Sequence, residues 1–419
     1  MSISRAGLLA GSVLGVVMLV GCGTAVRPQP AAPQPLPQVA ALDAAEVSTA
    51  MNADDALGID LLGAEAAHNQ GNLALSPASV AIALQMVATG ADGDTATQIA
   101  HVLHLPNVAA AGPAGQAATA GIAADARPGS VTLHTANTLW TQQGKPLLPG
   151  FTNGLTSHFG VAQHAADFAA DPDGARQAIN QLVATQTEGK IPALFPPGSI
   201  DASTRLVLTN ALYLAAAWQS QFQQAGTMPA AFTTASGATV KVPTMTNALT
   251  VNYASEPGYQ VVTLPYVGGK LGFSVLLPDP GSSTTALLGT LRGSGLAAAL
   301  AAAHPAEIAL SMPKFTVKSA MDLAGVLTAL GMPAAFGGQA NFDRISTEAT
   351  YLQAVEHDAY VQIDENGTVA AAATGMAVAA EGIAVPKGTH IEVNRPFLFA
   401  ITDLNTGLPL FLGRVADPS

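Results

Sequence analysis

The sequence predicts a mixed α+β fold built as one large domain. Helical patterns dominate its first part and strand patterns its later part, as expected when helices and strands segregate instead of alternating. No linker-like break interrupts residues 46 to 419. Hydrophobic residues make up 49% of the 419 residues, which is enough for a sizeable core.

Helix signals come first along the chain. Residues 45–69 place Leu57, Leu61 and Leu62 on one side of an amphipathic helix. Ser76 is suited to cap the next helix, with Pro77 at its first helical position. Two further helices are expected over 93–105 and from residue 174 to Gly189.

Strand signals follow. Residues 131–142 and 204–218 are rich in β-branched and apolar residues. Residues 259–281 indicate a hairpin around a Gly-Gly turn. Residues 306–332 predict one strand, a short connection and a helix ending at Gly331, and residues 391–418 predict two strands around a turn at Asn405.

Charge and cysteine content exclude several classes of function. Charged residues make up only 11% of the chain and the net charge is −12, which argues against nucleic acid as a partner. Cys22 is the only cysteine, so neither an intramolecular disulfide nor a multi-cysteine metal site can form.

The N-terminus predicts export and lipid anchoring. Arg5 precedes an apolar run that is too short to span a bilayer, which indicates a signal peptide over residues 1–21. The residues from Leu19 to Cys22 resemble a bacterial lipobox, in which the peptide is cut before a cysteine that is then lipidated. An ordinary signal peptide with an incidental cysteine is the alternative. Residues 22–45 then form the lipidated Cys22 and a proline-rich tether.

This N-terminus places the protein on the outer face of a bacterial cell membrane, with release into the medium as the alternative. The lipid anchor is then the only contact with the membrane.

Motifs for catalysis, phosphate binding and metal binding are absent from the sequence. It contains no G-x-S-x-G, H-E-x-x-H, Walker A or G-x-G-x-x-G pattern, and its nine histidines show no ligand spacing. We therefore expect no metal, no cofactor and no enzymatic activity. A hydrolase triad with members distant in the chain stays open as an alternative, because such a triad has no local signature.

Eight ordered stretches make the chain similar to the serpin family. They cover nearly all of residues 46 to 419, which are identified as a serpin domain on this basis. The resemblance implies three β-sheets, eight or nine helices and an exposed reactive-centre loop. The stretches are NLALSPASVAIALQMVATGA, INQLVATQTEGKI, LVLTNALYLAAAWQSQF, VTLPY, LSMPKFTVKSAMDLAGVLTALGM, ANFDRIS, VEHDAYVQIDENGTVAAAAT and EVNRPFLFAITDLNTGLPLFLGRV.

The resemblance gives the alanine-rich stretch before the C-terminus a role. In inhibitory serpins a protease cuts the loop and forms an acyl-enzyme, and the N-terminal part of the loop then inserts into the large sheet. Alternate residues of the inserting strand must be small and uncharged because they enter the interior. If Thr368 to Ala380 inserts, the new strand is roughly 40 Å long. The hinge and inward-facing residues implied by the family are Glu365, Gly367, Thr368, Ala370, Ala372 and Thr374.

The resemblance also implies residues that let the large sheet open. Ser76, Ser79, Asn210 and His357 match the polar "shutter" cluster beneath the opening strands, and Trp218 matches the "breach", where the loop first enters. For Trp218, simple core packing is the alternative.

The reactive bond is predicted between Glu381 and Gly382, by counting seventeen residues from Glu365. Cleavage elsewhere between Ala379 and Val385 is the alternative, because the loop is about four residues longer than is typical of the family. The implied partner is a serine protease held in a covalent complex, or less favourably a cysteine protease, with the inhibitor a monomer. A non-inhibitory binding or envelope protein with the same fold is the competing hypothesis.

Overall fold

The structure is a computed structural model of the full chain. It describes residues 43–126, 131–135, 138–145, 147–209, 211–347, 351–353, 355–368 and 389–419. These residues all belong to one structural unit. The predicted signal peptide, Cys22 and nearly all of the tether lie outside the described residues, so these assignments stay predictions.

Nine α-helices form within the described residues, in agreement with the fold implied by the resemblance. Ser76 caps the second of them by accepting a hydrogen bond of 3.1 Å from the Ser79 N–H, with Pro77 at the first helical position, as predicted. The helices are α1 (Ala44–His68), α2 (Pro77–Ala88), α3 (Gly93–Val102), α4 (Ala111–Asp125), α5 (Pro149–Phe159), α6 (Pro172–Gln186), α7 (Thr284–Ser294), α8 (Leu296–Ala301) and α9 (Ala324–Ala329).

In the part of the chain that the structure describes, the largest of three sheets has nine strands. Its order is β1-β17-β16-β10-β9-β8-β11-β15, and β7 pairs with β8 beside this path. The predicted hairpin is present as β9 and β10. The strands are β1 (Leu73–Leu75), β7 (Met228–Thr233), β8 (Thr239–Glu256), β9 (Tyr259–Pro265), β10 (Leu271–Pro278), β11 (His304–Pro313), β15 (Thr389–Glu392), β16 (Phe397–Asp403) and β17 (Pro409–Val415).

The described strands of the other two sheets share one register. A five-stranded sheet has the order β12-β13-β14-β6-β2, and a three-stranded sheet has the order β4-β3-β5. Thr135 pairs with Leu212 and Thr138 with Thr209, which is a single antiparallel register across both parts. The strands are β2 (Val131–Thr135), β3 (Thr138–Gln142), β4 (Ala162–Ala166), β5 (Leu206–Thr209), β6 (Leu212–Ala217), β12 (Phe315–Asp322), β13 (Glu356–Ile363) and β14 (Gly367–Thr368).

One element prediction was wrong. The single strand expected after residue 306 is two strands, β11 and β12, which belong to different sheets. The chain changes sheets at Lys314, directly after Pro313, a residue that has no N–H to donate to a ladder.

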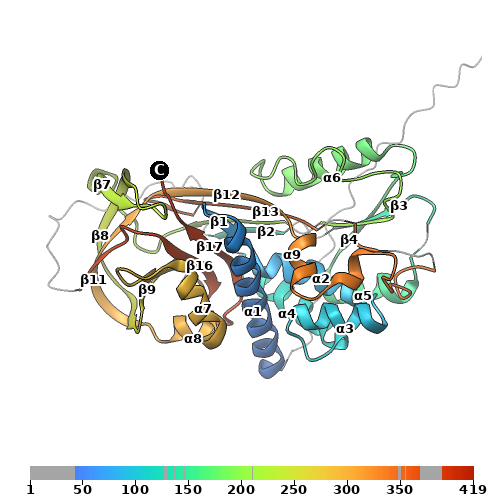
Figure 1. Ribbon diagram of the computed structural model, residues 1–419, viewed down its shortest axis with the longest axis horizontal. Coiled ribbons are helices and arrows are strands. Elements are labelled where there is room, and N and C mark those ends of the chain that lie inside the picture. Colours follow the sequence, from blue (N-terminus) through green and yellow to red (C-terminus); the bar gives the residue numbers. More distant parts are fainter. Residues whose placement is uncertain are drawn as a thin grey trace, which may run out of the picture. The chain divides into compact units, whose positions relative to one another are not determined.

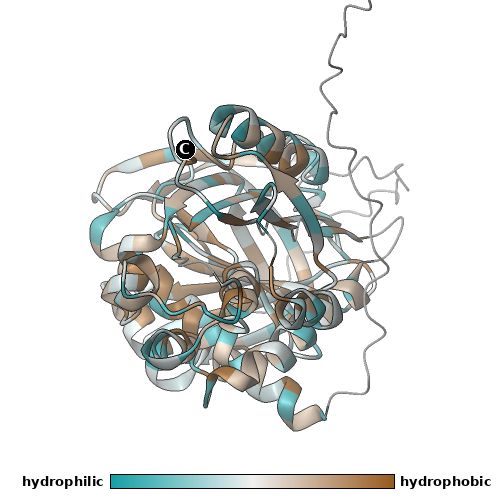
Figure 2. Cartoon of the chain, turned by 90° about the vertical axis from the view of Figure 1, so that its right-hand side faces the viewer, coloured by the Kyte–Doolittle hydropathy of each residue, from teal (hydrophilic) through white to brown (hydrophobic). Residues whose placement is uncertain are grey.

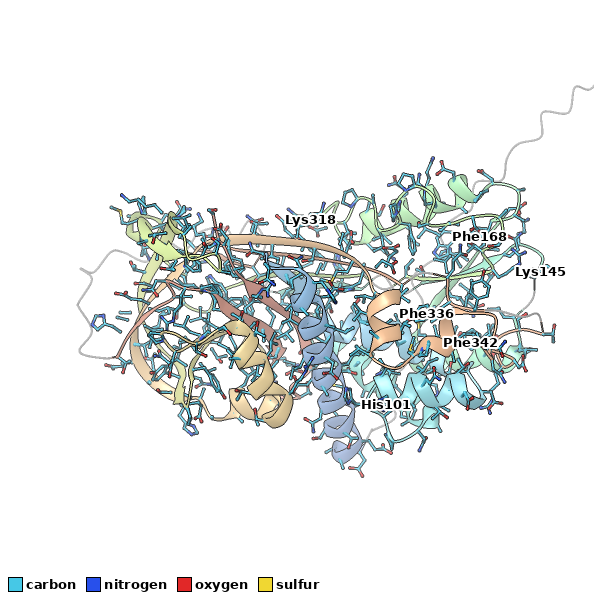
Figure 3. All side chains as sticks on the ribbon, viewed as in Figure 1. His101, Lys145, Phe168, Lys318, Phe336 and Phe342 are labelled. Atoms are coloured by element: carbon cyan, nitrogen blue, oxygen red, sulfur yellow. The ribbon has the colours of Figure 1, made fainter. Side chains whose placement is uncertain are left out.

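Helices cover both faces of the β2–β6–β13 layer. In Figure 1, α6 lies on one side of this layer and α2 and α4 lie on the other. The larger core joins α1, α2 and α4 to the sheets, and a smaller core lies under α6 around Phe168 (Figure 3). Apolar residues follow the interior strands and helix faces (Figure 2). No helix of the described residues is both long enough and apolar enough to cross a bilayer.

Candidate functional site

The predicted hinge forms the beginning of a strand inside the five-stranded sheet. Gly367 and Thr368 make up β14, which pairs antiparallel with Ala217 and Ala216 of β6 on one side and with Ile363 of β13 on the other. Among the described residues β6 and β13 are not paired with each other. We call the place between β5–β6 and β13, where a strand continuing from β14 would lie, the strand-insertion position.

Gly367 is required for this geometry. Its φ is +153°, and a Cβ added to it would lie 2.0 Å from the Ala216 carbonyl oxygen. A side chain at this residue would therefore push β14 away from β6.

Buried contacts of Glu365 hold the hinge in place. Its side chain is buried, and Oε2 lies 2.8 Å from Lys314 Nζ. Thr227 Oγ1 donates to Glu365 Oε1 at 2.7 Å, and the Phe222 N–H donates to the Glu365 carbonyl. Burial alone raises the pKa of Glu365, but the hydrogen bonds from Lys314 and Thr227 outweigh it and the pKa is lowered. The carboxylate is therefore charged and paired.

Trp218 forms the base of the hinge. Its Nε1–H donates to the Asp364 carbonyl at 2.8 Å, and its backbone N–H donates to the Asn366 carbonyl at 2.9 Å. The indole stacks on the Tyr266 ring at a centroid distance of 4.7 Å. The Tyr266 hydroxyl in turn hydrogen-bonds Thr368 Oγ1, and Thr368 is only 1% exposed. The tryptophan thus both packs in the core and holds the residues where β14 begins.

The described members of the shutter cluster lie together at the inner face of β13. The Ser76 N–H donates to His357 Nε2 at 3.0 Å, and Ser79 is joined to Ser76 through the cap of α2. Burial lowers the pKa of His357 to about 4, so the ring is neutral and its Nε2 accepts. Asn210 lies outside the described residues.

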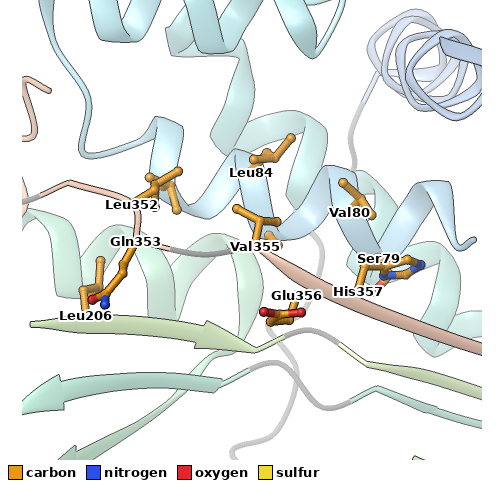
Figure 4. Close-up of a pocket in the computed structure, with 11 residues that line it drawn as sticks. Ser79, Val80, Leu84, Leu206, Leu352, Gln353, Val355, Glu356 and His357 are labelled. Carbon is orange, nitrogen blue, oxygen red and sulfur yellow. The ribbon is translucent and has the colours of Figure 1, made fainter. Parts of the chain in front are cut away.

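A pocket adjoins this cluster at the end of the strand-insertion position that lies between β5 and the start of β13. Figure 4 shows Ser79 and His357 at one end of the pocket and Leu206 and Leu352 at the other. Its lining comes from α2, from β5 and from the segment that leads into β13: Ser79, Val80, Ala83, Leu84, Val87, Leu206, Leu352, Gln353, Val355, Glu356 and His357.

On the outer face of the five-stranded sheet, the segment with Glu188 and Lys190 contacts both strands that border the strand-insertion position. The Tyr213 hydroxyl of β6 donates to Glu188 Oε2 at 3.1 Å, and Lys190 Nζ lies 5.4 Å from the centre of the Tyr360 ring of β13. A strand entering between β6 and β13 would pass beneath this segment.

Three carboxyl groups share the same outer face. Asp322 pairs directly opposite Glu356, and Asp358 follows two residues along β13. Burial, with smaller contributions from the charges of Asp322 and Asp358, raises the pKa of Glu356 to about 7. Because the folded state holds this proton more tightly than the unfolded state, the associated stability is lost as the pH rises from about 4.5 through 7.

We expect Glu356→Gln to raise the free energy of unfolding at pH 8 by about 1–2 kcal/mol, after discounting the pKa shift for solvent screening. At pH 3.5 the variant should nearly match the parent protein, because the carboxyl is then largely neutral in the folded and in the unfolded state. Thermal unfolding at the two pH values measures this. Glu307→Gln, at an exposed residue of β11, is the matched control, and equal effects of the two substitutions at pH 8 would contradict the assignment.

The remaining predicted site residues lie outside the described part of the chain. They are Ala370, Ala372, Thr374, Glu381 and Gly382, all within residues 369–388. The two ends of this segment are held in different sheets, β14 in the five-stranded sheet and β15 in the nine-stranded sheet. Within the described residues no three His, Cys, Asp or Glu side chains gather as a metal site.

Sequence reasoning missed several residues of this site. Lys314, Thr227 and Tyr266 bind the hinge, and none of them was singled out. The one available signal was at Lys314, a charged residue between Pro313 and Phe315 in an otherwise apolar stretch.

Comparisons with known proteins agree with this geometry. A family model described as "Serpin (serine protease inhibitor)" matches residues 52–418. "Iripin-8" of Ixodes ricinus is 32% identical over 378 residues, which cover 87% of this chain and 92% of that protein. "Leukocyte elastase inhibitor" of Sus scrofa is 33% identical over 358 residues, 83% and 93% of the two chains. The native-state crystal structure of the thermophilic serpin tengpin superimposes with a TM-score of 0.78 at 25% identity, covering 94% of this chain and 97% of tengpin.

Proposed function

Because the chain belongs to the serpin family, we propose that it inhibits serine proteases as a suicide substrate. The protease serine attacks the carbonyl carbon of the scissile residue, which we assign to Glu381, and the amine of Gly382 leaves. The ester formed joins the two proteins. Insertion of the loop then carries the protease along and distorts its active site before water can hydrolyse the ester.

The observation that carries this proposal is the place of β14. A strand that begins between β6 and β13, in register with both, needs only to be extended to become the new strand. The added residues form backbone hydrogen bonds alternately with the two neighbouring strands. The alternate residues Thr368, Ala370, Ala372 and Thr374 are small and uncharged, so nothing in the first part of the loop obstructs its entry.

Incubation with a panel of serine proteases tests the proposal. The panel should include enzymes that cut after acidic residues, elastase-like enzymes and subtilisin-like enzymes. We expect at least one to give a complex that survives SDS, and mass spectrometry should detect a fragment beginning at Gly382 when the cut follows Glu381. A protease whose catalytic serine is replaced by alanine is the control and should give no such complex.

A non-inhibitory binding or envelope role is the alternative outcome of that experiment. In that case every protease would cleave the loop and be released active, and no covalent complex would form. Heating separates the two roles independently, because loop insertion should raise the unfolding temperature after cleavage and a passive loop should not.

A further inference from the structure

Two polar side chains, Asp54 of α1 and Gln85 of α2, meet in the interior where these helices pack together. Asp54 is 1% exposed and Gln85 is fully buried. The Gln85 Nε2–H donates to Asp54 Oδ1 at 3.2 Å. The second oxygen of each group, Asp54 Oδ2 and Gln85 Oε1, is buried without a hydrogen-bond partner among the described residues. Two buried acceptors therefore lack a donor, which is rare in native interiors.

A single proton on Asp54 Oδ2 satisfies both of these oxygens. A neutral carboxylic acid has an O–H donor, and Gln85 Oε1 is the acceptor that this donor needs. The acid and the amide then exchange two hydrogen bonds, one in each direction. An ionised Asp54 has no donor to offer, so it would leave Gln85 Oε1 unsatisfied and a charge buried.

The immediate surroundings of Asp54 favour its neutral form. Burial raises the pKa of the carboxyl well above the usual value, the hydrogen bond from Gln85 lowers it, and the charge of Asp55 raises it. The neighbouring Asp55 is placed differently, because the N–H groups of Leu296 and Ala297 donate to its Oδ2 at 2.8 and 3.3 Å. These donors stabilise a charge on Asp55, whereas Asp54 meets only one neutral amide.

The described elements around α1 bring few charges toward this carboxyl. Helices α2, α8 and α9 and strand β1 carry no charged residue and no histidine. On the other elements, Asp60 engages both Arg292 of α7 and His104, and Arg414 of β17 donates to backbone carbonyls after α1. Helix α4 adds only the carboxyl of Asp125. A proton is therefore the available means of neutralising this carboxyl.

We propose that Asp54 is protonated in the folded protein and that its pair with Gln85 is a pH-sensitive latch between α1 and α2. The folded state then holds this proton more tightly than the unfolded state. The stability that the latch contributes is fully present below the ordinary aspartate pKa, and it is lost as the pH rises through the folded pKa. Helix α2 also carries the Ser76 cap that contacts His357, so the latch holds the helix on which the shutter cluster is built.

Asp54→Asn tests the proposal, because an asparagine amide can exchange the same two hydrogen bonds with Gln85 but cannot ionise. Urea unfolding of the full chain is measured at every pH unit from 5 to 8. We expect the unfolding constant of the parent protein, divided by that of the variant, to rise by about tenfold per pH unit until the folded pKa is passed. Groups that titrate in both proteins, such as Glu356, cancel in this ratio.

Glu46→Gln is the matched control, since it removes a carboxyl from an exposed residue of the same helix, and its ratio should stay nearly constant. Asp54→Leu removes both hydrogen bonds and leaves the Gln85 amide unpaired, so it should unfold more readily than Asp54→Asn at every pH. In ¹³C NMR of the aspartate carboxyl carbons, the resonance that Asp54→Asn lacks should keep the chemical shift of a protonated acid at pH 5 and above.

Three results would overturn the latch. The first is a ratio that stays constant from pH 5 to 8, or an Asp54 resonance that is already that of a carboxylate at pH 5. The second is equal stability of Asp54→Asn and Asp54→Leu, which would show that the pair with Gln85 contributes nothing. The third is an Asp54→Asn variant that fails to fold, because the charge of Asp54 would then be required.

Discussion

Thr368→Arg is expected to abolish covalent trapping of the protease while leaving cleavage of the loop intact. Thr368 is 1% exposed and lies against the Tyr266 hydroxyl on the inner side of the sheet. Thr368 Oγ1 hydrogen-bonds a hydroxyl and not a carboxylate, and burying a guanidinium without a carboxylate partner costs several kcal/mol. Slower insertion gives water time to hydrolyse the ester, so the yield of SDS-stable complex should fall at least about tenfold.

Two substitutions control for the loss of threonine and for the added charge. Thr368→Ser keeps the hydroxyl that meets Tyr266 and should trap the protease normally. Val369→Arg adds the same charge one residue later, on the face that the register turns outward, and should retain most of the trapping. If Thr368→Arg forms as much complex as the parent protein, the strand does not enter in the register that β14 sets.

Local signals allowed much of the fold to be predicted from the sequence. The start of α2 could be read from Ser76 and Pro77, because capping depends on residues three apart in the chain. The β9–β10 hairpin could be read from its Gly-Gly turn. The hinge, by contrast, was found through its resemblance to a family and not through any physical pattern in its own residues.

Several elements were not predicted from the sequence, and α4 and β8 illustrate two different physical reasons. Helix α4 is rich in alanine and glycine on all sides, so it shows almost no apolar periodicity, although alanine itself favours a helix. Strand β8 runs for 18 residues and pairs with β7, β9 and β11 along different parts of its length. Its burial pattern changes with its neighbours, and no single alternation describes it.

The contacts that hold the hinge could not be predicted because they join distant parts of the chain. Lys314 and Glu365 are brought together only when β12 and β13 pair side by side. Tyr266, which directly follows β9, hydrogen-bonds Thr368 and also stacks on Trp218. No spacing rule within one element contains this information.

Glu365→Lys is expected to release the hinge and to make the protein self-associate. In the parent protein the Glu365 carboxylate lies 2.8 Å from Lys314 Nζ. The substitution replaces this buried carboxylate by a second ammonium group, which repels Lys314. Breaking such a pair costs about 3 kcal/mol, the lower end of the usual range because Lys314 is partly exposed. Without β14, strands β6 and β13 lose the strand that pairs with both of them.

The edges of β6 and β13 that β14 leaves are then unpaired, and an unpaired edge can pair with another extended chain. A loop from a second molecule can therefore take the place of β14. We therefore expect ladders of polymers on native gels after mild heating of the Glu365→Lys variant, together with a lower unfolding temperature. The double variant Glu365→Lys with Lys314→Glu restores an opposite-charge pair with exchanged partners and should suppress both effects. Polymers that form equally in the single and double variants would show that the ion pair does not hold β14 in the sheet.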